Sequence, residues 1–424
     1  MNPSRTLAGL AVAAALFSRA LPICAADPEG ARPGPVKTAS TGHVSNYDEA
    51  KVGTYTLPDP LVLNDGRPVT DADTWTRIRR PEILELYRAH VFGRVPGNAP
   101  KAVATVEGVT PGALGGNAVR KVVVLRFGDG PGAPFIRLVI YLPARRAAKV
   151  PVLLHMAFNG EPAPTDPPAP SVPKGILGEP GPISDIVARG YAYAIYRYSD
   201  LQPDTADTRT SGVEALTASP GGSPAKDSWG TIAVWAWGAS RALDYLQTDP
   251  DFDGRRVALI GHSRLGKAAL WAGAQDPRFA LVFANCAGEM GTALSRRDYG
   301  ETVDDMVDRF PYWFAPGFGR YAGHWGDLPG DAHMLIALNA PHPLLVTGGS
   351  GDQWADPRGE FLAEVAAGPV YRLLGRKDLG VTQMPALDQD VNAGDLAYRI
   401  HAGPHAIMAS DWQVFLAFAD RYLR

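Results

Sequence analysis

Two patterns of hydrophobic and polar positions divide the chain. Residues 103–109, 121–127 and 136–143 alternate apolar and polar side chains, which predicts antiparallel strands with one face exposed. Later runs are short and almost continuously apolar, which is typical of strands buried on both faces of a largely parallel sheet. These runs cover residues 150–158, 191–198, 257–261, 281–285 and 343–349. The pattern therefore predicts that antiparallel N-terminal strands lead into a parallel sheet.

Helical spacing separates several of the buried strands. An amphipathic pattern covers residues 73–90, and helical patterns also cover residues 229–246, 361–367 and 411–420. Strands that alternate with helices predict an α/β fold in which helices cover both faces of the sheet through right-handed crossovers. We therefore predict one three-layer α/β sandwich over residues 46–424.

Stretches rich in Pro and Gly interrupt this rhythm. Residues 161–183 and 203–228 predict surface loops near the functional site, because strands and helices resume after each of them. Residues 27–45 combine Pro, Gly, Ser, Thr and charged side chains, which predicts a flexible leader.

The N-terminus has the pattern of an export signal. Arg5 precedes an apolar run that is too short to span a bilayer, and small residues follow it. We therefore predict a signal peptide over residues 1–26 and a secreted or periplasmic protein. Cys24 is a poor match to a lipid-anchor cysteine. Cleavage of the signal leaves Cys286 as the remaining cysteine, so no intramolecular disulfide is expected.

The charge balance excludes some classes of partner. The 424 residues hold 41 Lys and Arg against 44 Asp and Glu, which gives a formal net charge of -3. This balance argues against a nucleic-acid groove and against a polybasic membrane surface. We expect a monomer without a membrane span, and the residues imply neither a metal site nor a cofactor.

One junction between a strand and a helix carries a candidate nucleophile. In V-A-L-I-G-H-S-R-L-G-K-A-A-L, Ser263 lies between a buried strand and a helical pattern. Such a turn exposes the hydroxyl and directs the backbone donors of the helix N-terminus toward it. Gly261 and Gly266 permit a tight bend, whereas Leu265 occupies the second glycine position of a G-x-S-x-G motif. The junction predicts a serine hydrolase with the α/β-hydrolase fold.

A serine nucleophile needs a base, which in this fold follows the serine and the acid along the chain. The histidines after Ser263 are His324, His333, His342, His401 and His405. His405 lies in a loop between a strand-like segment and the last helical pattern, which is where the base is expected. His401 falls within that strand and is interpreted as structural.

The acid has two candidate positions. Asp352 directly follows the buried strand over residues 343–349, as the acid usually does in this fold. Glu289 follows the preceding strand and reaches the histidine only if its loop curls back. Cys286, in the same loop, is not a carboxylate. Asp356 precedes Pro357 and is interpreted as a helix cap.

These motifs, together with others downstream, resemble bacterial glucuronoyl esterases. The resemblance rests on G-H-S-R-L-G-K, A-L-S-R-R-D-Y-G-E-T-V, L-P-G-D-A-H-M-L-I-A-L-N-A-P and W-A-D-P-R-G-E-F, and it extends from about Leu57 to the C-terminus. It implies an exported α/β-hydrolase that cleaves esters between glucuronic acid, carried on xylan, and lignin alcohols.

The resemblance also implies roles for single residues. By position, Ser263 is the nucleophile, His405 is the base and Arg264 stabilises the oxyanion. A guanidinium at a helix N-terminus is electrostatically unfavourable, which supports a functional reason for its presence. The acid differs between branches of the family, one of which carries Glu at the position of Cys286 and another Asp at the position of Asp352.

A second group of residues matches positions that contact the sugar. Lys267 and Glu301 match positions that contact sugar hydroxyls, and Trp354 matches one that packs near the sugar. The predicted substrate is glucuronoxylan or another uronate ester, in keeping with lignocellulose degradation. Two alternatives stay open, namely an acetyl-xylan or other carbohydrate esterase, and a non-catalytic glycan-binding homologue. An acetyl pocket does not need Arg264, Lys267 and Glu301 together.

Overall fold

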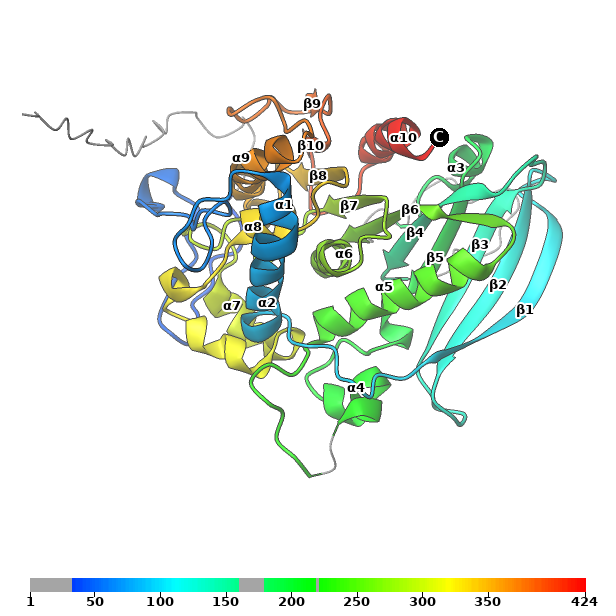
Figure 1. Ribbon diagram of the computed structural model, residues 1–424, viewed down its shortest axis with the longest axis horizontal. Coiled ribbons are helices and arrows are strands. Elements are labelled where there is room, and N and C mark those ends of the chain that lie inside the picture. The colour runs from blue at the N-terminus through cyan, green and yellow to red at the C-terminus, as the bar shows by residue number, and fades with distance from the viewer. Residues whose placement is uncertain (1–32, 160–178, 219–220) are drawn as a thin grey trace, which may run out of the picture.

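The computed structural model describes residues 33–159, 179–218 and 221–424, and its helices cover a central sheet (Figure 1). In these ranges the sheet has ten strands in the order β1-β2-β3-β5-β4-β6-β7-β8-β10-β9. The strands are β1 (Ala102–Ala113), β2 (Ala118–Phe127), β3 (Phe135–Pro143), β4 (Val150–Ala157), β5 (Ala192–Arg197), β6 (Phe252–His262), β7 (Leu281–Asn285), β8 (Leu344–Gly349), β9 (Asp390–Val391) and β10 (Leu396–His401). The predicted α/β architecture is confirmed.

The two kinds of strand pair as their patterns predict. β1, β2, β3 and β5 form antiparallel neighbours, whereas β5, β4, β6, β7, β8 and β10 run parallel. The prediction of one exposed face is wrong for the first strands. β1, at the edge of the sheet, is exposed along most of its length, whereas β2 and β3 are mostly buried.

The continuous apolar runs of the parallel strands fill two separate cores. Along β4, Val152, Leu154 and Met156 belong to one core, and Leu153 and Ala157 belong to the other. Successive side chains of a strand point to opposite faces, so burial of both faces requires an apolar residue at nearly every position.

Helices supply the outer layers on both sides of the sheet (Figure 1). The first core includes side chains of α2 (Arg80–His90), α5 (Thr231–Thr248), α6 (Arg264–Gln275), α8 (Ala332–Ala337) and α9 (Pro357–Leu373). The second core includes side chains of α3 (Ile183–Ala188) and α10 (Ala409–Leu423). None of the helices within the described ranges has an apolar stretch long enough to cross a bilayer.

The helix predicted over residues 73–90 is built from three consecutive pieces. It comprises α1 (Ala72–Thr74), a π-helical turn over Trp75–Arg79, and α2. The carboxylate of Asp71 caps its start by accepting a hydrogen bond from the N–H of Thr74 at 2.7 Å. Trp75 and Ile83 are fully buried, which fixes the helix against the first core.

The predicted leader and loops fall partly outside the described residues. The signal peptide over residues 1–26 lies outside them, as does most of the loop over residues 161–183. Residues 33–45 lie on the folded domain, where the Ser40 hydroxyl donates to Asp308 at 2.5 Å and His43 pairs with Asp298 at 2.9 Å. The loop over residues 203–228 contains a helix, α4 (Gly212–Thr217), which its Pro- and Gly-rich composition did not indicate.

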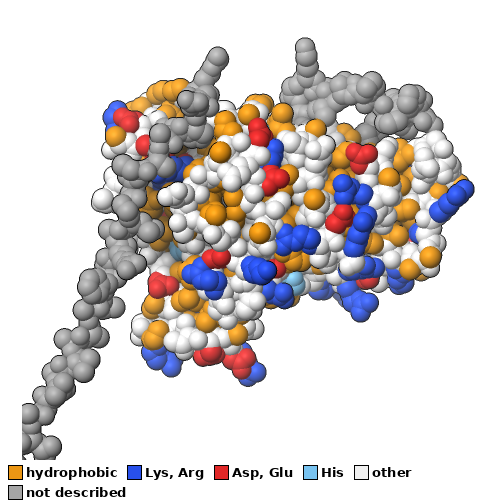
Figure 2. Space-filling view, turned by 90° about the horizontal axis from the view of Figure 1, so that it is seen from above, with side chains coloured by type: hydrophobic (Ala, Val, Ile, Leu, Met, Phe, Trp, Pro, Cys, Tyr) orange, Lys and Arg blue, Asp and Glu red, His pale blue; other side chains and the backbone are white. Residues whose placement is uncertain are grey.

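The face seen from above carries side chains of both charges. Lys and Arg side chains form several small groups there, with Asp and Glu side chains among them (Figure 2). This mixture agrees with the nearly balanced composition.

Candidate active site

Ser263 occupies a strained turn between β6 and α6. Its backbone has φ 57° and ψ -127°, a sparsely populated conformation for a residue with a side chain. The turn needs Gly261, because a Cβ there would lie 2.0 Å from the carbonyl oxygen of Leu265. The N–H of Ser263 donates to the carbonyl of Asn285 at 2.8 Å, which ties the turn to the neighbouring strand β7. This geometry is that of a nucleophile elbow, even though Leu265 replaces the second glycine.

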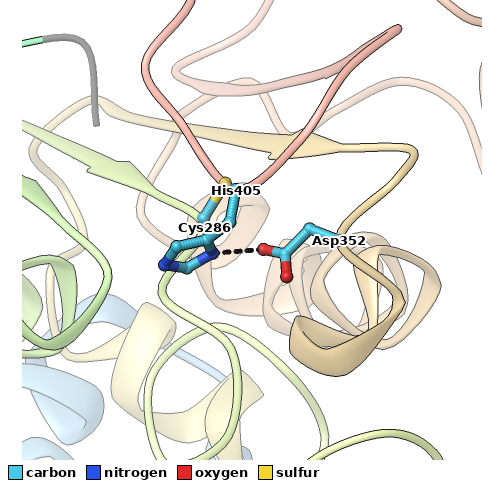
Figure 3. A group of neighbouring side chains, drawn as sticks. All are labelled: Cys286, Asp352 and His405. Carbon is cyan, nitrogen blue, oxygen red and sulfur yellow. Dashed lines mark hydrogen bonds and ion pairs between the residues drawn. The ribbon is translucent and has the colours of Figure 1, made fainter. Parts of the chain in front are cut away.

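His405 and Asp352 meet beside this turn. His405 lies in the loop between β10 and α10, and Asp352 follows the end of β8. The Nδ1 atom of His405 and the Oδ2 atom of Asp352 are 2.5 Å apart (Figure 3). The His405 ring also lies against His262, with 4.5 Å between the ring centroids, and His262 directly precedes Ser263. An acid and an imidazole are therefore paired next to the elbow.

The burial of this pair suits an acid and a base. The side chain of Asp352 is 6% exposed, whereas that of His405 is 36% exposed. The carboxylate is an acceptor, so it favours the tautomer with the proton on Nδ1 and leaves the lone pair on Nε2. The imidazole is thus oriented by a buried carboxylate and is accessible from solvent.

Glu289, the other candidate acid, has different partners. Burial raises the pKa of Glu289 well above its usual value, and a hydrogen bond from Ser295 and the charge of Lys267 oppose that rise. Two of its neighbours, Lys267 and Glu301, belong to the predicted sugar-binding group. The structure pairs His405 with Asp352 instead.

Cys286 lies directly beside the acid and the base. Its Sγ atom and one ligand atom each of Asp352 and His405 all lie within 4.8 Å of one another. Burial, followed by the negative charge of Asp352, raises the pKa of the Cys286 thiol well above its usual value. Within the described ranges, Cys286, Asp352 and His405 are the side chains whose ligand atoms lie close enough together to hold a metal ion. Asp352 and His405 are already paired with each other.

His401 and Asp356 have the structural roles expected from the sequence. His401 is four residues before His405, a spacing that some metal sites use, but its Nδ1 atom lies 2.8 Å from Asp411. Although burial lowers the pKa of His401, the Asp411 carboxylate outweighs that effect and raises it. Asp356 caps α9 by accepting a hydrogen bond from the N–H of Gly359 at 2.9 Å.

Arg264 is enclosed by aromatic rings and an acid. Its guanidinium carbon lies 4.7 Å from the ring centroid of Trp313 and 5.5 Å from that of Phe158. Its Nη1 atom donates a hydrogen bond to Asp204. Asp204 belongs to the loop over residues 203–228 and was missed by the sequence analysis. No motif or periodicity in that loop pointed to Asp204.

Lys267 and Glu301 belong to one buried charge group. Lys267 is 3% exposed, and its ammonium donates to the carbonyl of Ala287 at 2.5 Å. Burial lowers the pKa of Lys267, while the charge of Glu301 opposes that change. Burial raises the pKa of Glu301, and Lys267 opposes it in turn. Each group thus stabilises the charged form of the other.

Trp354 lies next to Glu301. Its carbonyl accepts a hydrogen bond from the N–H of Glu301 at 2.8 Å. Two cations that the sequence analysis missed lie near its ring, with Lys37 Nζ at 4.4 Å and Arg309 Cζ at 5.6 Å from the ring centroid. Arg309 also pairs with Glu301 at 3.5 Å. The predicted sugar contacts therefore form one contiguous polar and aromatic group.

Comparisons with known proteins point to one family. The sequence model described as glucuronyl esterase, fungi, matches residues 221–375. A carbohydrate esterase called MZ0003, from an unknown prokaryotic organism, is 41% identical over 400 residues, which cover 89% of this chain and 92% of that protein. A 4-O-methyl-glucuronoyl methylesterase from Schizophyllum commune is 31% identical, with 75% of this chain and 74% of that protein covered.

Solved structures agree with this assignment. The structure of a glucuronoyl esterase from Solibacter usitatus matches with a TM-score of 0.81 and 44% sequence identity, covering 89% of this chain and all of that one. A glucuronoyl esterase from Teredinibacter turnerae matches with a TM-score of 0.79 and 31% identity, covering 92% of this chain and 96% of that one. With its nucleophile elbow and its paired histidine and aspartate, this chain belongs to the glucuronoyl esterase family of carboxylic-ester hydrolases.

Proposed function

We propose that this protein hydrolyses esters of glucuronic acid or 4-O-methyl-glucuronic acid through Ser263, His405 and Asp352. The observation that carries the proposal is the 2.5 Å contact between His405 and Asp352 beside a strained serine turn. The membership of the chain in the glucuronoyl esterase family supports the choice of acyl group.

The proposed reaction has two halves. The Ser263 Oγ attacks the ester carbonyl carbon while Nε2 of His405 takes its proton, and Asp352 stabilises the imidazolium that forms. Collapse of the tetrahedral intermediate breaks the bond to the alcohol, which leaves with the proton of His405. Water, deprotonated by the same imidazole, then attacks the acyl-enzyme and releases the uronic acid and free Ser263.

Arg264 is the proposed charged donor to the oxyanion. Its backbone N–H lies at the first turn of α6, next to the nucleophile, and its guanidinium is fixed by neighbouring groups. A donor of this kind contributes on the order of 3 kcal/mol to the stabilisation of the transition state. The arginine therefore acts on the step that forms the tetrahedral intermediate.

Lys267, Glu301 and Trp354 are the proposed contacts to the sugar. An ammonium and a carboxylate offer both a donor and an acceptor to sugar hydroxyls, and the Trp354 indole, which hydrogen-bonds Glu301, offers an apolar face. The proximity of these side chains supports one binding site for a hydroxylated acyl group. This arrangement favours a uronoyl group over the acetyl group of the alternative esterase.

The proposed natural substrates are ester linkages between glucuronoxylan and lignin, and the proposed location is outside the cytoplasm. The export signal predicted over residues 1–26 supports this location, because plant cell-wall polymers do not enter cells. N-terminal sequencing of the protein recovered from the periplasm or medium tests it. A mature chain that begins near residue 27 is expected, and an unprocessed Met1 in the recovered protein contradicts export by this signal.

Hydrolysis of three esters tests the acyl group. We expect turnover of benzyl glucuronate to exceed that of methyl galacturonate and of an aryl acetate, each measured with the wild type and with Ser263→Ala. Preference for the aryl acetate would favour the acetyl-esterase alternative. Binding of glucuronoxylan without turnover of any ester would favour the non-catalytic alternative.

A further inference from the structure

Asp204 joins a surface loop to Arg264. Its Oδ2 atom accepts hydrogen bonds from Arg264 Nη1 and from the Tyr198 hydroxyl, the latter at 2.9 Å. Its Oδ1 atom accepts from the Tyr312 hydroxyl at 2.9 Å and from Trp313 Nε1 at 2.8 Å. A carboxylate offers about four lone-pair sites, so these four donors satisfy it completely. The side chain is 10% exposed and is held from several directions.

The other contacts of Arg264 leave part of its donor capacity unused. Trp313, Phe158 and Phe310 lie around the guanidinium, with ring centroids 4.7, 5.5 and 5.7 Å from its Cζ atom. These rings restrict the plane of the guanidinium without taking its N–H groups as ordinary hydrogen-bond donors. The Nε atom is buried and has no hydrogen-bond partner among the described residues. The Arg264 side chain as a whole is 27% exposed, so guanidinium N–H groups that Asp204 does not occupy can face a substrate oxygen.

We propose that Asp204 is a positioning residue for the esterase reaction. It fixes one edge of the Arg264 guanidinium, so that the remaining N–H groups are oriented in advance for the oxyanion that develops at the Ser263 adduct. The inference rests on the proposed function, since it assigns Arg264 to the oxyanion. Asp204 thus affects the geometry of the chemical step from the start of a surface loop, without contacting the reacting atoms.

Asp204 has two opposing effects on the stabilisation of the oxyanion, one from its charge and one from its positioning of Arg264. A negative charge beside Arg264 weakens the field that the arginine exerts on an oxyanion. Preorganised donors do not have to reorient as the charge develops, and this preorganisation is the main source of such stabilisation. Replacement of Asp204 therefore distinguishes the two effects. If the charge effect dominates, kcat rises on replacement, and if the positioning effect dominates, kcat falls.

Asp204→Asn is the primary test, because it keeps the size of the side chain while it removes the charge and one acceptor. We expect kcat on benzyl glucuronate to fall about 10- to 100-fold, less than the 10²- to 10³-fold loss typical for removal of an oxyanion donor. We expect KM to change by less than about threefold, because the arginine acts mainly on the transition state. Asp207→Asn, at an exposed position of the same loop, is the matched control and should leave kcat unchanged.

A double-mutant cycle with Arg264→Ala decides whether Asp204 acts through the arginine. We expect Asp204→Asn to have no further effect on kcat in the Arg264→Ala background, because the group that it positions is then absent. An equal loss in both backgrounds overturns the proposal, as does an unchanged or raised kcat in Asp204→Asn alone. A purely structural role lowers the melting temperature without this dependence on Arg264.

Two further measurements keep the result interpretable. If Asp204→Asn fails to fold, Tyr312→Phe removes one donor to the same carboxylate and keeps its charge, and its kcat should fall by a smaller factor that also disappears with Arg264→Ala. If the wild type cleaves the aryl acetate but no uronate ester, the proposed function fails. The same cycle measured on the acetate then still decides the role of Asp204.

Discussion

Replacement of Asp352 by Asn tests which carboxylate orients His405, the proposed catalytic base. The Oδ2 atom of Asp352 lies 2.5 Å from Nδ1 of His405, so the carboxylate keeps the proton on that nitrogen. An asparagine can present its NH₂ group there, which favours the tautomer with the proton on Nε2. That tautomer has no lone pair on Nε2, the nitrogen proposed to accept the proton of Ser263. The loss should therefore appear in kcat.

The size of the loss follows from the role of the carboxylate. Removal of the orienting acid from a serine triad lowers kcat on the order of 10⁴-fold. This factor corresponds to about 5 kcal/mol of transition-state stabilisation. Steady-state hydrolysis of benzyl glucuronate measures the loss, and thermal unfolding verifies that the variant is folded. Because Asn has nearly the same volume as Asp, the melting temperature should change little.

A second substitution makes this prediction more specific. Cys286→Glu in the Asp352→Asn background should recover part of the activity, because the Cys286 Sγ lies within 4.8 Å of ligand atoms of both Asp352 and His405. Cys286→Glu alone controls for the cost of a larger side chain, typically about 1–3 kcal/mol of stability. Glu289→Gln should have a mild effect on kcat. If it proves more damaging than Asp352→Asn, the orienting acid follows the earlier strand and the assignment of Asp352 is wrong.

Three further changes test the nucleophile, the sugar contact and a buried acid. Ser263→Ala should abolish ester hydrolysis and leave the melting temperature unchanged, and residual turnover near the wild-type rate contradicts the proposed nucleophile. Lys267→Met should raise KM for uronate esters more than it lowers kcat, because Lys267 forms a charge group with Glu301, and an unchanged KM contradicts that role. Burial raises the pKa of Glu360 to about 8 from an ordinary value of 4.5, so the folded protein binds the extra proton between these values. The stability that protonated Glu360 contributes is fully present below pH 4.5. It is lost as the pH rises to 8, by about 1.4 kcal/mol per pH unit. Glu360→Gln should flatten this fall in urea unfolding measured from pH 5 to 8, and an unchanged slope contradicts the raised pKa.

Much of the fold was predictable because the parallel strands are buried on both faces. The run from β4 alternates between two apolar cores, so nearly every position had to be hydrophobic. The exposure of the edge strand β1 could not be predicted in the same way. Val103 and Val109 are 67% and 55% exposed, and an apolar side chain at the edge of a sheet looks the same in the sequence as one in the core.

The placement of the proposed triad residues was predictable because the position of each follows from its strand. Ser263, Asp352 and His405 each come after a buried strand, and the ends of parallel strands lie at the same edge of the sheet. Asp204 and Lys37 could not be found in this way. Asp204 contacts Arg264 across 60 positions of the chain from a loop without periodicity, and Lys37 reaches Trp354 from the predicted leader. Contacts of this kind depend on the path of a loop, which composition does not specify.

The pairing of β7 with β8 places the two candidate acid positions, Cys286 and Asp352, near the same histidine. Asn285 of β7 pairs with Thr347 of β8, and the N–H of Cys286 donates to the carbonyl of Thr347 at 2.7 Å. Neighbouring strands are about 4.8 Å apart, so side chains at the two strand ends approach the same imidazole. An acid can therefore change strands while the serine and the histidine stay in place.

The two positions are not independent of each other. The charge of Asp352 contributes to the raised pKa of Cys286, and it would act in the same way on a carboxyl group at that position. Two carboxylates that share a buried site do not both ionise readily, so the second is held protonated. In Cys286→Glu alone, the new acid should thus remain neutral and add nothing to the rate. It becomes an anion and an orienting group only when Asp352→Asn removes the first charge, which is why the recovery of activity is expected in the double variant.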